Sequence, residues 1–130
     1  MSDLPADQER RANAIAIEAM RAAGYTIVET EVKSRRSGID IVARDSDGFV
    51  FAEVYTAQAS ANDRPPAISR EKTAKVFRAV RQWLTQRELW EAPWRLILVG
   101  VDLNLAGRPI GTRIAEEPFP HLKEFRHGDS

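Results

Sequence analysis

The chain contains no cysteine, and this absence excludes several kinds of chemistry. A chain without cysteine forms no disulfide, supplies no thiolate to a metal and has no cysteine nucleophile. Histidine is nearly absent too: the chain has two, His121 and His127, both near the C-terminus and too far apart in sequence to suggest a pair of metal ligands. We assign neither histidine a role.

The sequence also lacks a net charge and a long apolar run. Its 19 Lys and Arg residues balance 19 Asp and Glu residues, so any binding of nucleic acid must come from a local patch rather than from overall charge. No apolar run approaches the roughly 18 residues that a membrane span needs. The first eleven residues are polar and acidic, unlike a secretory signal. We therefore expect a cytoplasmic protein with no membrane partner.

What is present is typical of one globular domain. A chain of 130 residues is long enough to bury a core without disulfides. With 43% hydrophobic and 29% charged residues, it is too apolar to be disordered. We expect a single domain over residues 1–130, with a loosely specified C-terminal tail from about residue 115.

Apolar periodicity predicts two helices and several strands. The expected helices span residues 3–23 and 69–88, the second with Ser69 as its N-cap. The expected strands span residues 25–32, 39–44, 49–55 and 95–103, with a further edge strand at 110–114. Residues 56–66 show no periodicity and are expected to form a loop. This order predicts an α/β fold with a mixed sheet flanked by helices.

Two carboxylates lie inside an otherwise apolar hairpin, whose turn is the segment DSDG at residues 45–48. If this segment closes the hairpin, paired positions sum to 93, and Asp40 lies directly opposite Glu53. If the turn slips by two residues, the two acids become diagonal neighbours on the same face. Like charges this close repel each other unless a cation or a shared proton intervenes. The pair therefore predicts a site for a divalent metal such as Mg²⁺.

A solvated sheet face is the alternative interpretation of the same two acids. On such a face, Glu53 would pair with Arg44 or Arg95, and Asp40 with Arg36. The neighbouring side chains argue against it, because Val42 and Phe51 share the face and are apolar.

A locally basic segment follows the predicted loop. Within residues 64–81, Glu71 alone opposes six basic residues: Arg64, Arg70, Lys72, Lys75, Arg78 and Arg81. Lys72, Lys75 and Arg78 form one row at helical spacing, and Arg35 and Arg36 extend the basic character to the turn before Asp40. This arrangement predicts DNA as a partner. A solvated helix face is again the alternative.

Several segments together resemble the YraN family of predicted endonucleases, within the PD-(D/E)XK nuclease superfamily. They are GY at 24–25, GIDIVARD at 38–45, FAEV at 51–54, PAISREK at 66–72, WL at 83–84 and VGVD at 99–102. The resemblance covers about residues 12–102. It implies a restriction-endonuclease-like sheet, in the order α-β-β-β-α-β, with Asp40 and Glu53 holding Mg²⁺ or Mn²⁺ for phosphodiester hydrolysis.

The sequence departs from the family pattern two residues after Glu53. The pattern implies a lysine there, and this chain has Tyr55, whose phenol can donate a hydrogen bond but brings no positive charge. Two acids of the pattern are also missing, since SG stands at 37–38 and AN at 12–13 where the family has GE. Lys33, Lys72 and Lys75 are the lysines available to replace the missing one.

These departures leave two interpretations. Loss of a positioned donor of this kind costs about a hundred- to a thousandfold in rate. The first interpretation is therefore a DNA-associated, nuclease-fold protein that binds nucleic acid or another protein and has reduced or lost hydrolysis. The alternative is an active Mg²⁺- or Mn²⁺-dependent endonuclease, with Asp40 and Glu53 as ligands, Tyr55 contacting substrate or water, and Lys72 as the relocated lysine. A homodimer or a protein partner is compatible with either.

Overall fold

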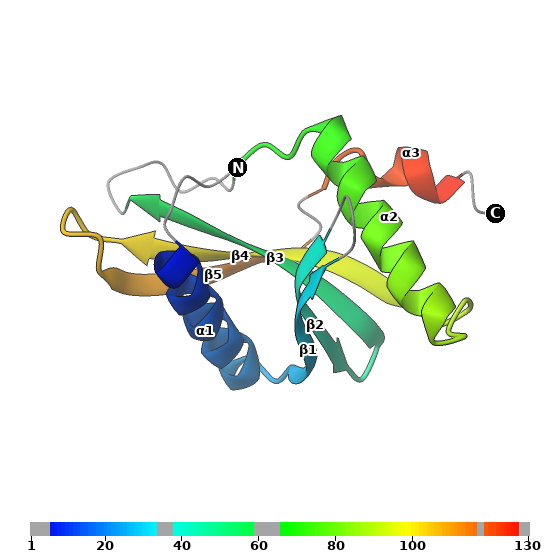
Figure 1. Ribbon diagram of the computed structural model, residues 1–130, viewed down its shortest axis with the longest axis horizontal. Coiled ribbons are helices and arrows are strands. Elements are labelled where there is room, and N and C mark those ends of the chain that lie inside the picture. Colours follow the sequence, from blue (N-terminus) through cyan, green and yellow to red (C-terminus); the bar gives the residue numbers. More distant parts are fainter. Residues whose placement is uncertain (1–5, 34–37, 59–65, 117–118, 128–130) are drawn as a thin grey trace.

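The helices and strands of the computed structural model are built from residues 6–33, 38–58, 66–116 and 119–127, which are the residues that the structure describes (Figure 1). In chain order they are α1 (Ala6–Ala22), β1 (Thr26–Lys33), β2 (Gly38–Asp45), β3 (Gly48–Gln58), α2 (Arg70–Gln86), β4 (Trp94–Leu103), β5 (Pro109–Glu116) and α3 (Leu122–His127). No helix in these ranges is long and apolar enough to cross a membrane.

The strands form one mixed sheet in the order β1-β2-β3-β4-β5. The pairs β1–β2, β2–β3 and β4–β5 are antiparallel, whereas β3 and β4 are parallel. Parallel neighbours need a crossover, and α2 provides it. The predicted α/β class and the order α-β-β-β-α-β are confirmed, and the additional edge strand is β5.

Helices cover both faces of the sheet, with α1 on one side and α2 and α3 on the other (Figure 1). The small side chains of Ala12 and Ala16 are buried on α1 and let that helix lie close to the strands. On the other face, Trp83 of α2 packs edge-on against Phe49 and Phe51 of β3. Two separate apolar layers therefore fix the sheet between its helices.

The start of α2 is fixed by a cap. Ser69 is the N-cap, as predicted, and its Oγ accepts a hydrogen bond from the backbone N–H of Lys72 at 3.0 Å. Its carbonyl oxygen accepts a second bond from the buried hydroxyl of Thr73 at 2.8 Å. These bonds fix the first turn of α2, which carries Lys72.

Two parts of the fold differ from the sequence prediction. Residues 56–58, predicted as loop, continue β3, because they pair with residues 101–103 of β4 after the crossover. The tail contains α3, which is too short to be stable alone and packs on α2 through the rings of Phe125 and Phe77, 5.8 Å apart, with an exposed Arg70–Glu124 ion pair of 2.7 Å beside them. Both depend on contacts between segments distant in sequence. The predicted beginning of the first helix, at residue 3, lies outside the described residues.

Replacement of Ile97 by alanine should lower the free energy of unfolding by about 2–5 kcal/mol, because Ile97 is completely buried in the layer under α1. The matched variant is Ile110→Ala on β5, where the side chain is 57% exposed and the expected change is about 0.5 kcal/mol or less. Urea unfolding followed by tryptophan fluorescence measures both. Equal losses in the two variants would contradict this description of the core.

Candidate active site

The β2–β3 hairpin has the register in which paired positions sum to 93. Arg44 pairs with Phe49 and Asp45 with Gly48, and the side chain of Asp45 accepts a hydrogen bond from the N–H of Asp47 in the turn. Gly48 has a φ of +136° and lies so close to the carbonyl of Pro93 that a Cβ atom would clash with it. The slipped register is therefore not the one observed.

The two predicted acids lie where β2 and β3 stop pairing. The last pair of the ladder is Ile41–Ala52. Beyond it, Glu53 Oε2 accepts a hydrogen bond from the backbone N–H of Asp40 at 3.1 Å. In return, Asp40 Oδ2 accepts one from the N–H of Val54 at 2.8 Å. The carboxylates thus take the place of ladder partners, and each is held by the backbone of the opposite strand.

Both carboxyl groups are buried enough to change their acidity. Glu53 is 8% exposed, and burial together with repulsion from Asp40 raises its pKa to about 7, although Lys72 acts in the opposite direction. Burial also raises the pKa of Asp40, against the hydrogen bond from Val54. The acid pair therefore retains a proton close to neutral pH unless a further cation joins it.

Lys72 is the predicted replacement lysine that the structure brings to the acids. Its Nζ lies 3.0 Å from Glu53 Oε1, with the lysine side chain half exposed and the glutamate buried. Lys75 instead reaches Glu71 on the helix surface, at 3.8 Å. The side chain of Lys33 lies outside the described residues.

The alternative of a solvated face does not describe these acids. Glu53 pairs with Lys72, whereas Arg95 binds Asp45 at 2.8 Å and Glu116 at 2.9 Å. Val42 and Phe51, on the same face, are buried in the layer under α2. The proposed partner of Asp40, Arg36, lies outside the described residues.

Tyr55 is on the same face of β3 as Glu53 but lies over β4. A Cβ atom added to Gly100 would be 2.6 Å from both Cζ and Oη of Tyr55, so the phenol occupies the space that Gly100 leaves open. Burial raises the pKa of the phenol, which therefore stays protonated and can donate a hydrogen bond at neutral pH.

The donor atoms of the acid pair suit a hard cation. Mg²⁺ and Mn²⁺ bind carboxylate oxygens, and Mg²⁺ is commonly held by one or two carboxylates, with water and substrate phosphate completing its shell. Within the described ranges, no group of three or more His, Cys, Asp and Glu residues is placed to hold a metal. The residues that could hold such an ion are Asp40 and Glu53, whose carboxylates meet at the end of the ladder.

Two further acids lie near Asp40, and sequence reasoning missed both. Glu9 of α1 and Glu31 of β1 are close enough to raise the pKa of Asp40. Glu9 stands one helical turn before Asn13, where the family pattern has an acid, so its spacing was a usable signal. Glu31 has a φ of +51°, and the sequence carries no sign of that conformation.

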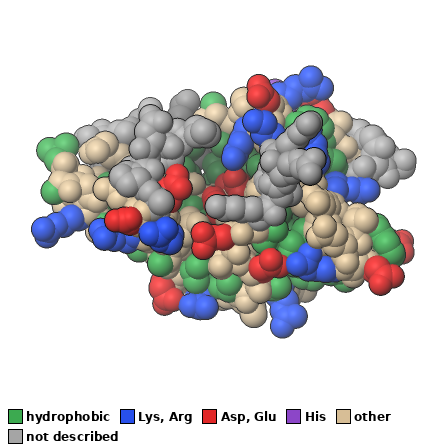
Figure 2. All heavy atoms as spheres, in the orientation of Figure 1, with side chains coloured by type: hydrophobic (Ala, Val, Ile, Leu, Met, Phe, Trp, Pro, Cys, Tyr) green, Lys and Arg blue, Asp and Glu red, His purple; other side chains and the backbone are tan. Residues whose placement is uncertain are grey.

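The predicted basic patch is partly neutralised by its own neighbours. Arg70 bonds Glu124 and lies over the ring of Phe125, while Lys72 and Lys75 have the acidic partners given above. Arg78 is exposed on α2. Figure 2 shows acidic side chains gathered at the middle of one face with basic side chains beside them. The predicted contacts Arg35, Arg36 and Arg64 lie outside the described residues.

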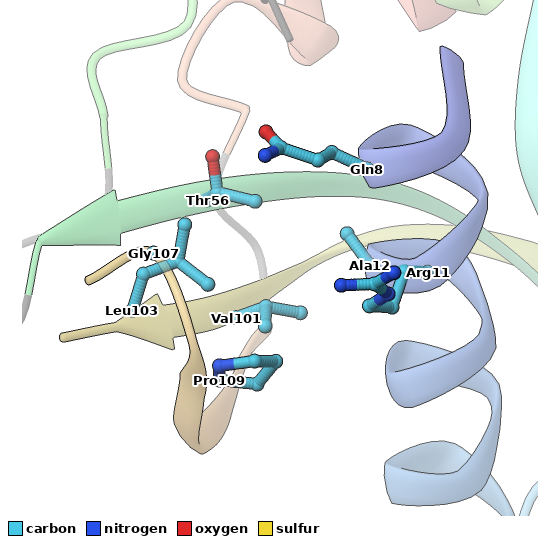
Figure 3. A pocket seen from close by; sticks show the side chains of 8 residues that line it. All are labelled: Gln8, Arg11, Ala12, Thr56, Val101, Leu103, Gly107 and Pro109. Carbon is cyan, nitrogen blue, oxygen red and sulfur yellow. The ribbon is translucent and has the colours of Figure 1, made fainter. Parts of the chain in front are cut away.

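A shallow pocket lies on the opposite side of the sheet. It opens between the first half of α1 and the ends of β3 and β4, and Gln8 reaches across it toward Thr56 (Figure 3). Thr56 follows Tyr55 on β3 and so faces the other way. The residues that line this pocket include no carboxylate, and the pocket is separate from the acid pair.

Comparisons with known proteins place the chain in a family. The profile of the family described as "Uncharacterised protein family UPF0102" matches residues 12–101. A UPF0102 protein of Streptomyces coelicolor is 34% identical over 104 residues, which are 78% of this chain and 80% of that protein. One of Geotalea uraniireducens is 33% identical over 89 residues, 68% of this chain and 70% of that protein.

Other matches are more partial. A UPF0102 protein of Oleidesulfovibrio alaskensis is 32% identical over 83 residues, 63% of this chain but 41% of that protein's length. The solved structure of Pyrococcus furiosus SfsA in complex with Ca²⁺ has a TM-score of 0.39 and 17% identity, over 84% of this chain and 62% of that chain. Because the family profile covers more than half of its residues, the chain belongs to the UPF0102 family, the YraN family that its motifs resemble.

Proposed function

We propose that the protein is a metal-dependent nuclease that hydrolyses phosphodiester bonds in DNA and takes its catalytic lysine from α2 instead of β3. The observation that carries the proposal is the 3.0 Å contact between Lys72 Nζ and Glu53 Oε1. This contact brings a positive charge to Glu53, and the family pattern also has a positive charge, that of a lysine, beside this carboxylate. Of the two interpretations that the sequence left open, this contact favours the active enzyme.

The role of the lysine depends on where its ammonium group lies, not on which element carries it. An ammonium group beside the acid pair can stabilise negative charge that develops on a phosphoryl oxygen. The cap at Ser69 fixes the turn of α2 that carries Lys72, so its backbone is held in place before substrate binds. Tyr55, at the position where the family pattern has a lysine, lies over Gly100 on β4.

The remaining groups fit the same chemistry. Asp40 and Glu53 would hold Mg²⁺ or Mn²⁺, which when bound supplies a Lewis acid and lowers the pKa of a water molecule. Arg78, exposed on α2, would contact the DNA backbone beside the site.

A second candidate is a DNA-binding module without hydrolysis. The observation that favours it is the neutral Tyr55 at the position where the family pattern has a lysine. In such a protein Lys72 would serve to balance the charge of Glu53. Such a protein would bind DNA in a salt-sensitive manner and leave it intact.

The first test is cleavage of plasmid, single-stranded and branched DNA with Mg²⁺ or Mn²⁺. We expect cutting by the unmodified protein and a loss of about a hundredfold or more in Asp40→Asn, Glu53→Gln and Lys72→Met. Lys123→Met, at an exposed lysine on α3, is the matched control and should retain most of the rate. Unchanged cutting by Lys72→Met would refute the relocated lysine. Salt-sensitive binding without cutting by the unmodified protein would favour the module.

A second test moves the positive charge back to β3. The double variant Tyr55→Lys, Lys72→Met should recover part of the activity that Lys72→Met loses, because an ammonium group again lies beside Glu53. The control is the double variant Tyr55→Gln, Lys72→Met, which changes the same positions without a charge. Equal rates for the two double variants would show that the charge at this place is not what the reaction needs.

A third test uses the acidity of Glu53. Its pKa is raised from 4.5 to about 7 on folding, so between these values the folded protein keeps a proton that the unfolded chain releases. Its stabilising contribution is complete below about pH 4.5 and is lost as pH rises to about 7. The unfolding free energy, relative to Glu53→Gln, should therefore fall by up to about 3 kcal/mol across this window in EDTA.

Metal binding should show the matching dependence on pH. Because Glu53 must lose its proton to bind a cation, the rise in melting temperature caused by Mn²⁺ should be larger at pH 8 than at pH 6. In Glu53→Gln the rise in melting temperature should be small at both pH values.

For the test of stability in EDTA, the contradicting outcome is a set of parallel curves: if the unmodified protein and Glu53→Gln change in stability with pH by the same amount, the pKa of Glu53 is not raised.

A further inference from the structure

The sheet face that carries the acid pair continues past it as a second row of polar side chains. Glu53 of β3 pairs with Leu98 of β4. Two residues further along, Tyr55 of β3 pairs with Gly100 of β4, and Gly100 in turn pairs with Arg113 of β5. Residues two apart on a strand share a face and lie roughly 7 Å apart. Tyr55 and Arg113 thus flank Gly100 on the face to which Glu53 belongs.

Gly100 makes this row a continuous surface. It has no positive φ that would require glycine, yet a Cβ atom there would overlap the end of the Tyr55 ring. A glycine inside a strand marks close approach by another group, and here that group is the phenol. The hydroxyl of Tyr55 therefore extends over β4 toward β5, where Arg113 stands.

Arg113 is held in place by an acid on the neighbouring strand. Its Nη2 donates to Asp102 Oδ1 at 2.8 Å, and the side chains are 31% and 18% exposed. Besides burial, the charges of both residues affect the pKa of Tyr55, Arg113 lowering it and Asp102 raising it, so all three side chains are close to one another. A fixed guanidinium group and a phenol O–H then lie together on the face that carries Glu53, with Tyr55 two residues along β3 from Glu53 and Arg113 two strands away on β5.

We propose that Tyr55 and Arg113 bind a second phosphodiester of the strand, beyond the one at the acid pair, so that the protein takes a DNA strand of at least two phosphates. This deepens the proposed function and rests on it for the identity of the strand. Arg113 and Tyr55 are substrate-binding residues, and Asp102 is a positioning residue that acts through Arg113.

The chemistry of the row favours a phosphate over other ligands. A guanidinium group binds phosphate oxygens with charge-assisted hydrogen bonds, and a phenol donates one more. Asp102 holds the guanidinium at the surface of the sheet, which limits the rotamer freedom that binding would otherwise have to remove. The acid pair repels phosphate unless a cation is bound, so the row also gives the strand a contact that needs no metal.

Fluorescence anisotropy with a labelled single-stranded DNA oligonucleotide tests the proposal, in EDTA and again with Ca²⁺. Arg113→Gln should raise Kd about tenfold and reduce the slope of log K against log salt by about 0.7. Tyr55→Phe, which removes the hydroxyl alone, should raise Kd about threefold. The matched control is Arg21→Gln, which breaks an exposed Arg–Glu pair of the same 2.8 Å length on α1 and should leave both quantities unchanged.

A further variant guards against an indirect effect of leaving Asp102 without its partner. The double variant Asp102→Asn, Arg113→Gln removes both charges and should bind as weakly as Arg113→Gln. Binding of Arg113→Gln equal to that of the unmodified protein, with the same salt slope, would overturn the proposal, as would absence of binding by the unmodified protein in both solutions.

The two proposals fail separately. Cleavage that depends on Lys72, together with binding that ignores Arg113, would leave the proposed function standing and remove this site. DNA binding that depends on Arg113, without any cleavage, would support this binding site and remove the proposed nuclease activity.

Discussion

The arrangement around the acid pair depends on the two hydrogen bonds that cross the end of the β2–β3 ladder. Asp40 and Glu53 each accept a bond from the backbone of the other strand. A buried carboxylate without such partners would be too costly to keep. Because these side chains accept the hydrogen bonds in place of backbone carbonyls, β2 and β3 separate at a defined place and both acids are fixed there. Lys72 and Tyr55 take their positions around that opening.

Glu53 connects stability and function at this opening. Its carboxylate contacts the ammonium group of Lys72 at 3.0 Å, and the same oxygen would be needed by a cation. Burial and the neighbouring Asp40 raise its pKa to about 7, so the folded protein keeps the group at the margin of ionisation. A cation of the kind proposed would compete with both Lys72 and the proton for this carboxylate, so its binding would change the charge of the site.

Features that depend on neighbouring residues could be predicted from the sequence, whereas features that depend on packing between distant segments could not. The hairpin register followed from the turn and from a period of two, so the placement of Asp40 opposite Glu53 was accessible from sequence, as was the cap at Ser69. Which lysine would reach the acids was not, because it depends on where the crossover sets α2 on the sheet. The end of β3, the short α3 and the approach of Glu31 likewise arise from contacts between distant segments.

Tyr55 and Gly100 bear on whether the departure from the family pattern is decay or rearrangement. Glycine in the interior of a strand costs about 0.5–1 kcal/mol relative to alanine, and Gly100 lies in the middle of β4. That cost is explained by the phenol that fills the space above it. Gly100 lies in the VGVD segment by which the chain resembles the family, and the phenol of Tyr55 fills the space above that glycine. Lys72 places a positive charge beside Glu53, so the departure at Tyr55 has not removed from the site the charge that the proposed hydrolysis needs.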